Sequence, residues 1–114
     1  MTCAHLSEVR PVQPQTDGCQ ECLEQGTQWV ELRLCLSCGH VGCCNSSSGR
    51  HAQAHFHATG HPIVRAFRTG NDWAYCLEDG VYVDTEAIDQ AVQAAIHHAS
   101  RMRLQQHAKY FRLV

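Results

Sequence analysis

Short stretches of alternating apolar and polar residues predict several strands in the first two thirds of the chain. Residues 29–36, Trp-Val-Glu-Leu-Arg-Leu-Cys-Leu, alternate with the period of two that is typical of a strand. Residues 41–44 favour a short strand, residues 63–67 an extended segment, and residues 73–77 and 80–84 the two strands of a hairpin. Residues 1–18, with two prolines, predict an extended arm before these elements.

Two segments predict helices. Residues 50–59 favour a helix that Ser48 caps and Gly60 ends. Residues 85–109 predict a longer helix, which Asp84 or Thr85 caps. One of its faces carries apolar residues at three- and four-residue spacing: Ile88, Val92, Ala95, Ile96, Ala99 and Met102. We expect this face to pack on the rest of the chain, with dimerisation as the alternative. Strands and helices together predict a small α+β domain.

Cysteine and histidine residues form a regular series between the predicted strands. The series comprises Cys19, Cys22, Cys35, Cys38, Cys43, His51, His55 and His61. A C-x-x-C turn places two thiolates on one side of a tight loop, where a tetrahedral zinc ion can bridge them. Eight such ligands are the number that two closed tetrahedral sites require, so we expect two structural zinc ions.

Composition and charge narrow the classes of partner. The 114 residues carry a formal charge of −2, so no strongly basic surface favours nucleic acid. The chain shows neither a signal-peptide pattern nor a run of about 18 apolar residues, and we expect a cytoplasmic protein that does not enter membranes. In that compartment, eight cysteines indicate metal ligands or redox groups rather than disulfides.

The residues alone leave the pairing of the eight ligands open. One partition places Cys19, Cys22, Cys35 and Cys38 on one zinc ion and leaves Cys43 and the three histidines for the other. The other partition interleaves the two C-x-x-C pairs with the later ligands. Interleaving spreads the thiolate charge more evenly over the two ions, so electrostatics mildly favours it. The ligand set is the same in both cases.

The order of these residues resembles the UBP-type, ubiquitin-binding zinc finger of ubiquitin-specific proteases and a histone deacetylase, in its compact bacterial branch. The matching residues are Cys19-Gln-Glu-Cys22, Trp29, Cys35-Leu-Ser-Cys38, Cys43, His51, His55, His61-Pro62 and Tyr75-Cys76. The resemblance covers roughly residues 3–84. It implies a zinc finger over residues 1–84. The apolar stripe predicts that the C-terminal part, residues 85–114, packs on this finger through its helix and belongs to the same domain.

The resemblance also implies a small twisted antiparallel sheet and a particular ligand pairing. Cys19, Cys22, Cys43 and His51 would bind the first zinc ion, and Cys35, Cys38, His55 and His61 the second. Some family members bind a third zinc ion, for which this chain offers Cys3, His5, Cys76 and Asp79. Asp79 replaces a cysteine, and a carboxylate is an acceptable zinc ligand. In the alternative reading Cys76 is simply buried and the arm is loose.

The family resemblance implies a pocket for a free C-terminal carboxylate, with Trp29, Trp73, Tyr75 and Tyr82 as its candidate lining. The family's arginine in a Cys-Gly-Arg tripeptide is missing, because this chain has Cys43-Cys44-Asn45. Its loss removes a charge-assisted bond to a carboxylate and argues against ubiquitin as the partner. Arg50, Arg65 and Arg68 are the candidate replacements. We expect a module that binds a protein or peptide, with a C-terminal tail as one form of that partner.

The sequence does not predict an enzyme. His51 and His55 have the spacing of a zinc hydrolase pair, but the glutamate base between them is absent. Closed sites also leave no position for a reactive water molecule. The alternative functions are a thiol-based redox or zinc sensor that uses Cys44, and, less favoured, nucleic-acid binding. His40 is interpreted either as a hydrogen-bond donor to a zinc-bound thiolate or as an exposed loop residue.

Overall fold

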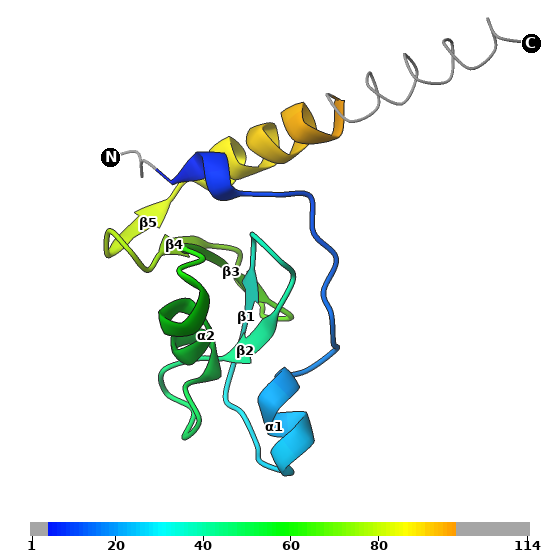
Figure 1. Ribbon diagram of the computed structural model, residues 1–114, viewed down its shortest axis with the longest axis vertical. Coiled ribbons are helices and arrows are strands. Elements are labelled where there is room, and N and C mark those ends of the chain that lie inside the picture. Colours follow the sequence, from blue (N-terminus) through cyan, green and yellow to red (C-terminus); the bar gives the residue numbers. More distant parts are fainter. Residues whose placement is uncertain (1–4, 98–114) are drawn as a thin grey trace, which may run out of the picture.

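The computed structural model describes residues 5–97 and has a five-stranded antiparallel sheet at its centre (Figure 1). The strands are β1 (Leu32–Cys35), β2 (Val41–Cys43), β3 (Ile63–Phe67), β4 (Ala74–Cys76) and β5 (Val81–Val83), in the order β2-β1-β3-β4-β5. Around them lie the 3-10 helix η1 (Leu6–Glu8), the helices α1 (Gln20–Gln25) and α2 (His51–Thr59), and a last helix from residue 85 to residue 97. The predicted α+β class and antiparallel sheet are confirmed.

The two faces of the sheet carry different side chains, because the strand register alternates them. On one face Ile63, Ala74 and Cys76 are buried together with Val9 of the arm and Ile88 of the last helix. On the other face α2 lies against β2. Gly42 permits that contact, because a Cβ there would lie 2.6 Å from the backbone nitrogen of Ala52. The helix α2 lies mainly against β2, with fewer contacts to β1, and a pocket opens on the rest of this face.

The metal-type ligands change the local structure that the sequence predicts. Ser48 does not cap α2: the N-cap residue is Arg50, in the left-handed region with φ 47°, and it makes no side-chain capping bond. Instead the N–H of His51 donates to the sulfur of Cys43 at 3.2 Å. The turn expected around the first C-x-x-C is also a helix, α1, whose N-cap Cys19 accepts from the N–H of Cys22. In both cases a cysteine sulfur takes the place of the usual capping oxygen.

The arm crosses the buried face of the sheet instead of standing apart from it. Val9 is buried, and the N–H of Arg10 donates to the carbonyl of Leu36 at 2.8 Å. Further along, the N–H of Gln15 donates to the carbonyl of Gly39 at 2.9 Å. The described part of the arm is therefore ordered by backbone hydrogen bonds, although η1 is its only regular element between residues 5 and 18.

The last helix begins where the sequence predicts. The carboxylate of Asp84 accepts from the N–H of Glu86 at 3.1 Å, which is an N-cap bond. Ile88 is fully buried, whereas Ile96 is 41% exposed, so the apolar stripe leaves the core toward residue 97. Residues 98–109 of the predicted helix, with Ala99 and Met102, lie outside the described residues. The division into residues 1–84 and 85–114 stays a prediction.

Between residues 5 and 97 no helix has both the length and the apolar character that a membrane span requires.

We predict that Ile88 anchors the last helix. Ile88→Ala should lower the free energy of unfolding of the zinc-loaded protein by about 2–5 kcal/mol, because it leaves a cavity in the core. Ile96→Ala on the same helix should cost about 1 kcal/mol or less, since that side chain keeps much of its contact with water. Urea denaturation at fixed zinc concentration measures both, and equal losses would contradict the assignment of Ile88 to the core.

Candidate functional site

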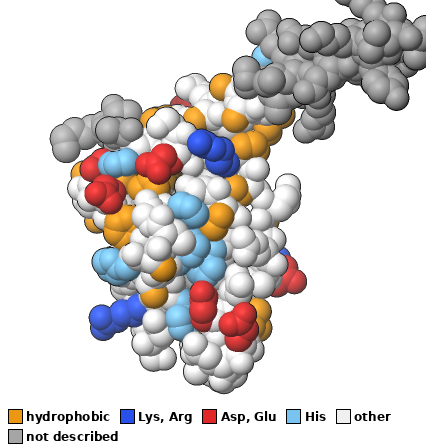
Figure 2. Space-filling view, viewed as in Figure 1, with side chains coloured by type: hydrophobic (Ala, Val, Ile, Leu, Met, Phe, Trp, Pro, Cys, Tyr) orange, Lys and Arg blue, Asp and Glu red, His pale blue; other side chains and the backbone are white. Residues whose placement is uncertain are grey.

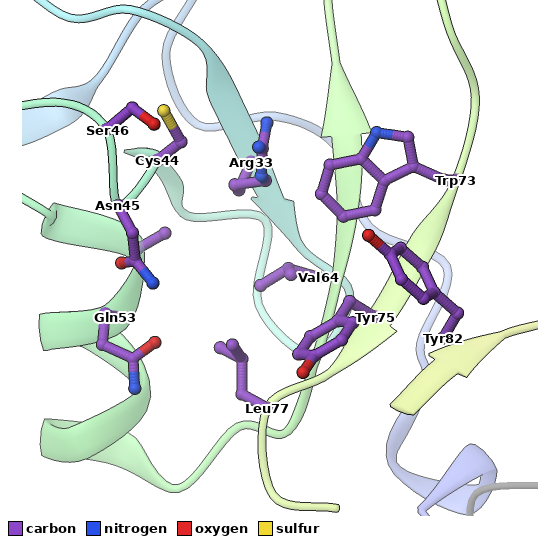
Figure 3. A pocket seen from close by; sticks show the side chains of 11 residues that line it. Arg33, Cys44, Asn45, Ser46, Gln53, Val64, Trp73, Tyr75, Leu77 and Tyr82 are labelled. Carbon is purple, nitrogen blue, oxygen red and sulfur yellow. The ribbon is translucent and has the colours of Figure 1, made fainter. Parts of the chain in front are cut away.

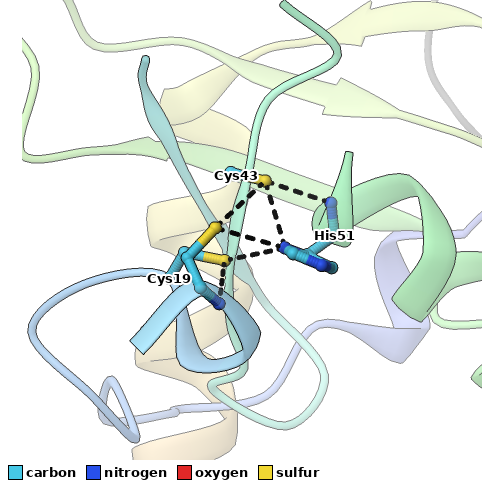
Figure 4. Close-up of side chains that lie close together, drawn as sticks. Cys19, Cys43 and His51 are labelled. Carbon is cyan, nitrogen blue, oxygen red and sulfur yellow. Dashed lines mark hydrogen bonds between the residues drawn. The ribbon is translucent and has the colours of Figure 1, made fainter. Parts of the chain in front are cut away.

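The first ligand cluster joins three segments of the chain. Cys19 and Cys22 come from the start of α1, Cys43 from the end of β2, and His51 from the first turn of α2. Their four ligand atoms all lie within 4.8 Å of one another, and the cysteine and histidine side chains point toward a common centre (Figure 4). Four of the eight cysteine and histidine residues in the series thus form a closed group of three sulfurs and one imidazole nitrogen.

The spacing of these atoms fits a zinc ion. With Zn–S bonds near 2.3 Å and Zn–N bonds near 2.0 Å, tetrahedral geometry predicts edges of about 3.8 Å between sulfurs and about 3.5 Å between sulfur and nitrogen. Nδ1 of His51 lies 3.3 Å, 3.4 Å and 3.3 Å from the sulfurs of Cys19, Cys22 and Cys43. The sulfurs of Cys22 and Cys43 are 4.0 Å apart. The cluster therefore has the size of a tetrahedral zinc site.

The second cluster consists of Cys35, Cys38, His55 and His61, again with all ligand atoms within 4.8 Å. The sulfur of Cys35 lies 3.6 Å from Nδ1 of His61, and the sulfur of Cys38 lies 3.3 Å from Nε2 of His55. Figure 2 shows histidine side chains gathered over the middle of one face of the molecule. The structure thus brings together the two interleaved sets, not the set of four cysteines from the two C-x-x-C pairs.

Without a cation the thiols of Cys19 and Cys35 would be protonated at pH 7. Burial is the main cause that raises the pKa of Cys19 to about 12 and the pKa of Cys35 to about 11. Burial, with the nearby His40 and His61, lowers the pKa of His55 to about 4, so this imidazole is neutral and ready to act as a ligand at pH 7. A bound zinc ion reverses the preference of the thiols, because it stabilises thiolate directly. Both clusters therefore fit a zinc ion in two ways: the distances between their ligand atoms match a tetrahedral site, and each contains a thiol that needs a cation to ionise at pH 7.

A third group of ligand-type residues lies at the other end of the sheet. Nδ1 of His5 lies 3.1 Å from Oδ2 of Asp79 and 3.5 Å from the sulfur of Cys76, and the N–H of Asp79 donates to the same sulfur at 3.4 Å. Their ligand atoms also lie within 4.8 Å of one another. Cys3, the fourth predicted member, lies outside the described residues. The three described members form a third candidate site, which links the arm to the turn between β4 and β5.

A pocket of about 400 Å³ opens on the free part of the sheet, beside α2 (Figure 3). Trp73, Tyr75 and Tyr82 form one wall, and Tyr82 packs edge-on against the other two rings at 5.9 Å and 5.1 Å. The remaining lining residues are Arg33, Cys44, Asn45, Ser46, Ala52, Gln53, Val64 and Leu77. The predicted aromatic lining is thus present in three of its four members.

Trp29 is the exception. Its ring lies against Gly18, where an added Cβ would come within 2.5 Å of the indole, and it packs on the first cluster. The Trp29 side chain therefore belongs to the surroundings of the first candidate zinc site and does not line the pocket. The sequence could not separate the two places, because the position of Trp29 between the two C-x-x-C motifs does not show which way its ring points.

Arg33 supplies the cation of the pocket, which none of the three expected arginines does. Its guanidinium lies 4.3 Å from the centre of the Trp73 ring, a cation–π contact. It also donates to the carbonyl of Leu32 at 3.0 Å and lies 3.4 Å from the carboxylate of Glu31. Arg65 instead binds Asp72 and Asp89, and Arg68 binds Asp17. Arg50 occupies the N-cap position of α2 and is not among the lining residues of the pocket. The alternation of residues 29–36 could have placed Arg33 opposite the leucines, but not beside Trp73.

Cys44 lies in the pocket and outside both clusters. Burial raises the pKa of its thiol, but the hydroxyl of Ser47 and backbone N–H groups outweigh burial and lower the pKa overall. Its side chain is only 6% exposed, and its sulfur lies 3.6 Å from the hydroxyl of Ser47. A lowered pKa agrees with the redox-sensor alternative, whereas burial restricts the access of an oxidant.

Comparison with known proteins relates this arrangement to one family. The family model described as "Zn-finger in ubiquitin-hydrolases and other protein" matches residues 19–88. The chain is 32% identical over 80 residues to the BRCA1-associated protein of Mus musculus, covering 70% of this chain and 12% of that protein. It is 30% identical over 98 residues to histone deacetylase 6 of Caenorhabditis elegans, covering 82% of this chain and 10% of that protein. The chain thus spans about a tenth of the length of these relatives.

The fold also matches a solved structure. A protein of Rhodopseudomonas palustris, determined by solution NMR, shares 49% sequence identity and a TM-score of 0.68 with this chain. The match covers 74% of this chain and 82% of that protein.

We predict that the first cluster holds one zinc equivalent that does not depend on Cys44. Cys22→Ser should remove that equivalent, because three ligands no longer close the tetrahedral site. Cys44→Ser should retain the wild-type zinc content, since Cys44 belongs to neither cluster. Native mass spectrometry of protein purified without added metal counts the ions directly. The assignment fails if both variants lose the same amount of zinc.

Acid should release zinc from the first cluster more steeply than from the second. The thiols with pKa values of about 12 and about 11 bind protons in the metal-free state, so lower pH favours the zinc-free form. Three thiols release up to three protons when zinc binds, and two thiols release two. Between pH 8 and pH 7 the affinity should therefore fall up to about 1,000-fold at the first cluster and about 100-fold at the second. His55 remains neutral over this range and adds no proton.

Chelator competition in two variants, each retaining one cluster, measures the two slopes. Cys38→Ser retains the first cluster and Cys22→Ser the second. Equal slopes would contradict the difference in the number of thiolate ligands.

Proposed function

This chain belongs to the family of zinc fingers found in ubiquitin hydrolases and other proteins, and we propose that it is a non-catalytic module that binds the free C-terminal tail of a protein or peptide. In this proposal the first two clusters are closed structural zinc sites, and His5, Cys76 and Asp79 contribute to a third. The zinc ions hold α1, α2 and the sheet together, and the tail enters the pocket between α2 and β4. The free cysteines of the described chain fit the reducing cytoplasm, where we place the module.

Arg33 in its aromatic pocket is the observation that carries this proposal. Among the lining residues that lie between positions 5 and 97, it is the one charged residue, and none is Asp or Glu. A guanidinium binds a carboxylate through two parallel hydrogen bonds, which are about twice as strong as bonds between neutral groups. The amides of Asn45 and Gln53 lie across the pocket from the aromatic wall and could bind the peptide backbone (Figure 3). A chain terminus presents a carboxylate and a backbone amide side by side.

The metal geometry supports a structural role for zinc. Each of the two clusters offers four protein ligands, so a tetrahedral ion bound there has no position for a water molecule. A catalytic zinc ion needs that open position to activate water. The residues between His51 and His55 also include no acid that could serve as a base. These features support a binding module over a hydrolase.

The cation of the pocket comes from a different position than the family resemblance implies. Asn45 stands where the resemblance leads us to expect an arginine, and Arg33 reaches the pocket from β1 instead. Because Arg33 reaches the pocket from a different element, it would bind the carboxylate at a different position in the pocket. The preferred tail therefore need not have the same last residues as ubiquitin. We therefore propose a free C-terminal tail as the ligand and leave ubiquitin as one member of the peptide set to be tested.

Binding should require both a free carboxylate and Arg33. Peptides with free C-termini, including one that ends in Gly-Gly, should bind about 10- to 100-fold more tightly than the same peptides with amidated C-termini, because amidation removes a charge-assisted interaction. Arg33→Ala should abolish this difference. Arg68→Ala should retain it, since Arg68 is exposed and binds Asp17 away from the pocket. Fluorescence anisotropy at constant ionic strength measures the affinities.

Equal affinity of the wild-type protein for free and amidated peptides would reject recognition of the carboxylate. If Arg33→Ala and Arg68→Ala weaken binding alike, the charge of the protein and not the pocket would account for the preference.

A further inference from the structure

His40 makes a contact that neither sequence interpretation includes. It is 6% exposed, so it is not a surface loop residue, and its hydrogen-bond partner is not a thiolate. Nε2 of His40 lies 2.9 Å and 2.7 Å from the two carboxylate oxygens of Glu21. An ionised carboxylate only accepts hydrogen bonds, so Nε2 carries the proton and donates it. The pair is therefore a partly buried, charge-assisted hydrogen bond between α1 and the residue that directly precedes β2.

The ring of His40 also supports a ligand of the second cluster. It stacks on the ring of His55 with a centroid distance of 4.0 Å and an angle of 5° between the planes. On its other side His55 meets the ring of His61 edge-on at 5.4 Å. Nε2 of His55 is the atom that faces the sulfur of Cys38, at 3.3 Å. The stack thus limits the rotation of an imidazole whose direction decides whether it can bind the metal.

Glu21 connects this stack to the first cluster. It lies in α1 directly before Cys22 and two residues after Cys19, which is the N-cap of the same helix. The position of Glu21 therefore depends on a short helix whose start carries two ligands of the first cluster. A continuous chain of contacts runs from those ligands through Glu21 and His40 to His55 in the second cluster.

We propose that Glu21 and His40 form a positioning pair that couples the loading of the two zinc sites. The proposal rests on the ligand sets given under the proposed function. Zinc in the first site holds α1, α1 holds Glu21 against His40, and His40 holds His55 in the orientation that binds zinc in the second site. By thermodynamic linkage, zinc in the second site then strengthens binding at the first by the same factor. Neither residue is itself a metal ligand.

The coupling predicts how zinc leaves the protein. Groups that orient a metal-binding histidine typically contribute about 10- to 100-fold to metal affinity. During a chelator titration the wild-type protein should lose the ions of the first and second clusters together, with little of the species that keeps only one of these two ions. Glu21→Gln keeps the size of the side chain and removes its charge. In this variant the second site should release zinc at an at least 10-fold lower chelator concentration, and the species without that ion should accumulate.

Glu24→Gln is the matched control, because Glu24 is an exposed glutamate on the same short helix. It should give the wild-type curve. Native mass spectrometry during the titration counts the ions, and replacement of zinc by cobalt identifies the remaining site. Cobalt with three thiolates absorbs more strongly in the sulfur-to-metal charge-transfer region than cobalt with two. We expect the three-thiolate spectrum from the Glu21→Gln intermediate.

A second variant separates the hydrogen bond from the stack. His40→Phe keeps an aromatic ring beside His55 but cannot donate to Glu21, so it should behave like Glu21→Gln. The double variant should be no weaker than either single variant, within about twofold, if the two residues act as one unit. If the losses of zinc affinity in the two single variants multiply in the double variant, the two residues act independently, and this result would reject the positioning pair. Identical curves for Glu21→Gln and Glu24→Gln would overturn the coupling, whereas a wild-type protein that binds no zinc at the two clusters would reject the ligand sets themselves.

Discussion

The structure depends on bringing buried sulfur and imidazole groups from distant segments to common centres that fit a cation. The described core is small, and in one of its two apolar clusters three of the five buried members are cysteines of the first ligand cluster. These thiols gain little from mutual contact, because burial makes their ionised form costly. A zinc ion changes the sign of that cost, since binding free energy in such modules becomes folding free energy. The first ligand cluster therefore serves as the core of this half of the domain.

The position of the pocket follows from the same constraint. His51 and His55 point from α2 toward two different clusters, which attach the helix to the sheet at two points. Gly42 lets the helix approach β2 closely, and a pocket opens beside the helix on the same face of the sheet. The pocket contains Arg33 and the aromatic side chains of β4 and β5. The pocket proposed for binding thus lies beside the two ligand clusters, and none of its described lining residues belongs to either cluster.

Some local predictions failed where a sulfur atom replaced a more common partner. Residues 63–67 form a strand with the expected bounds, and Asp84 caps the last helix, because backbone propensity and side-chain capping act there without competition. The start of α2 differs, since Cys43 accepts the N–H that Ser48 was expected to satisfy. The sequence also does not predict α1. Six residues have little intrinsic tendency to form a helix, and here the sulfur of Cys19 caps the first turn. Sulfur acceptors are not part of the residue patterns that predict helix ends.

The sequence by itself determined the family, the fold class and the eight residues that gather in the two main clusters, because spacing along the chain limits which side chains can reach one ion. Spacing alone does not fix how these eight residues pair, because electrostatics favours the interleaved sets only mildly. Only the tertiary structure decided that Trp29 faces the first cluster, that Arg33 reaches the aromatic pocket, and that His40 joins Glu21 to His55. Each of these contacts depends on how strands and helices far apart in the chain are placed against each other. Local periodicity records which side of an element a residue occupies, but not what lies opposite.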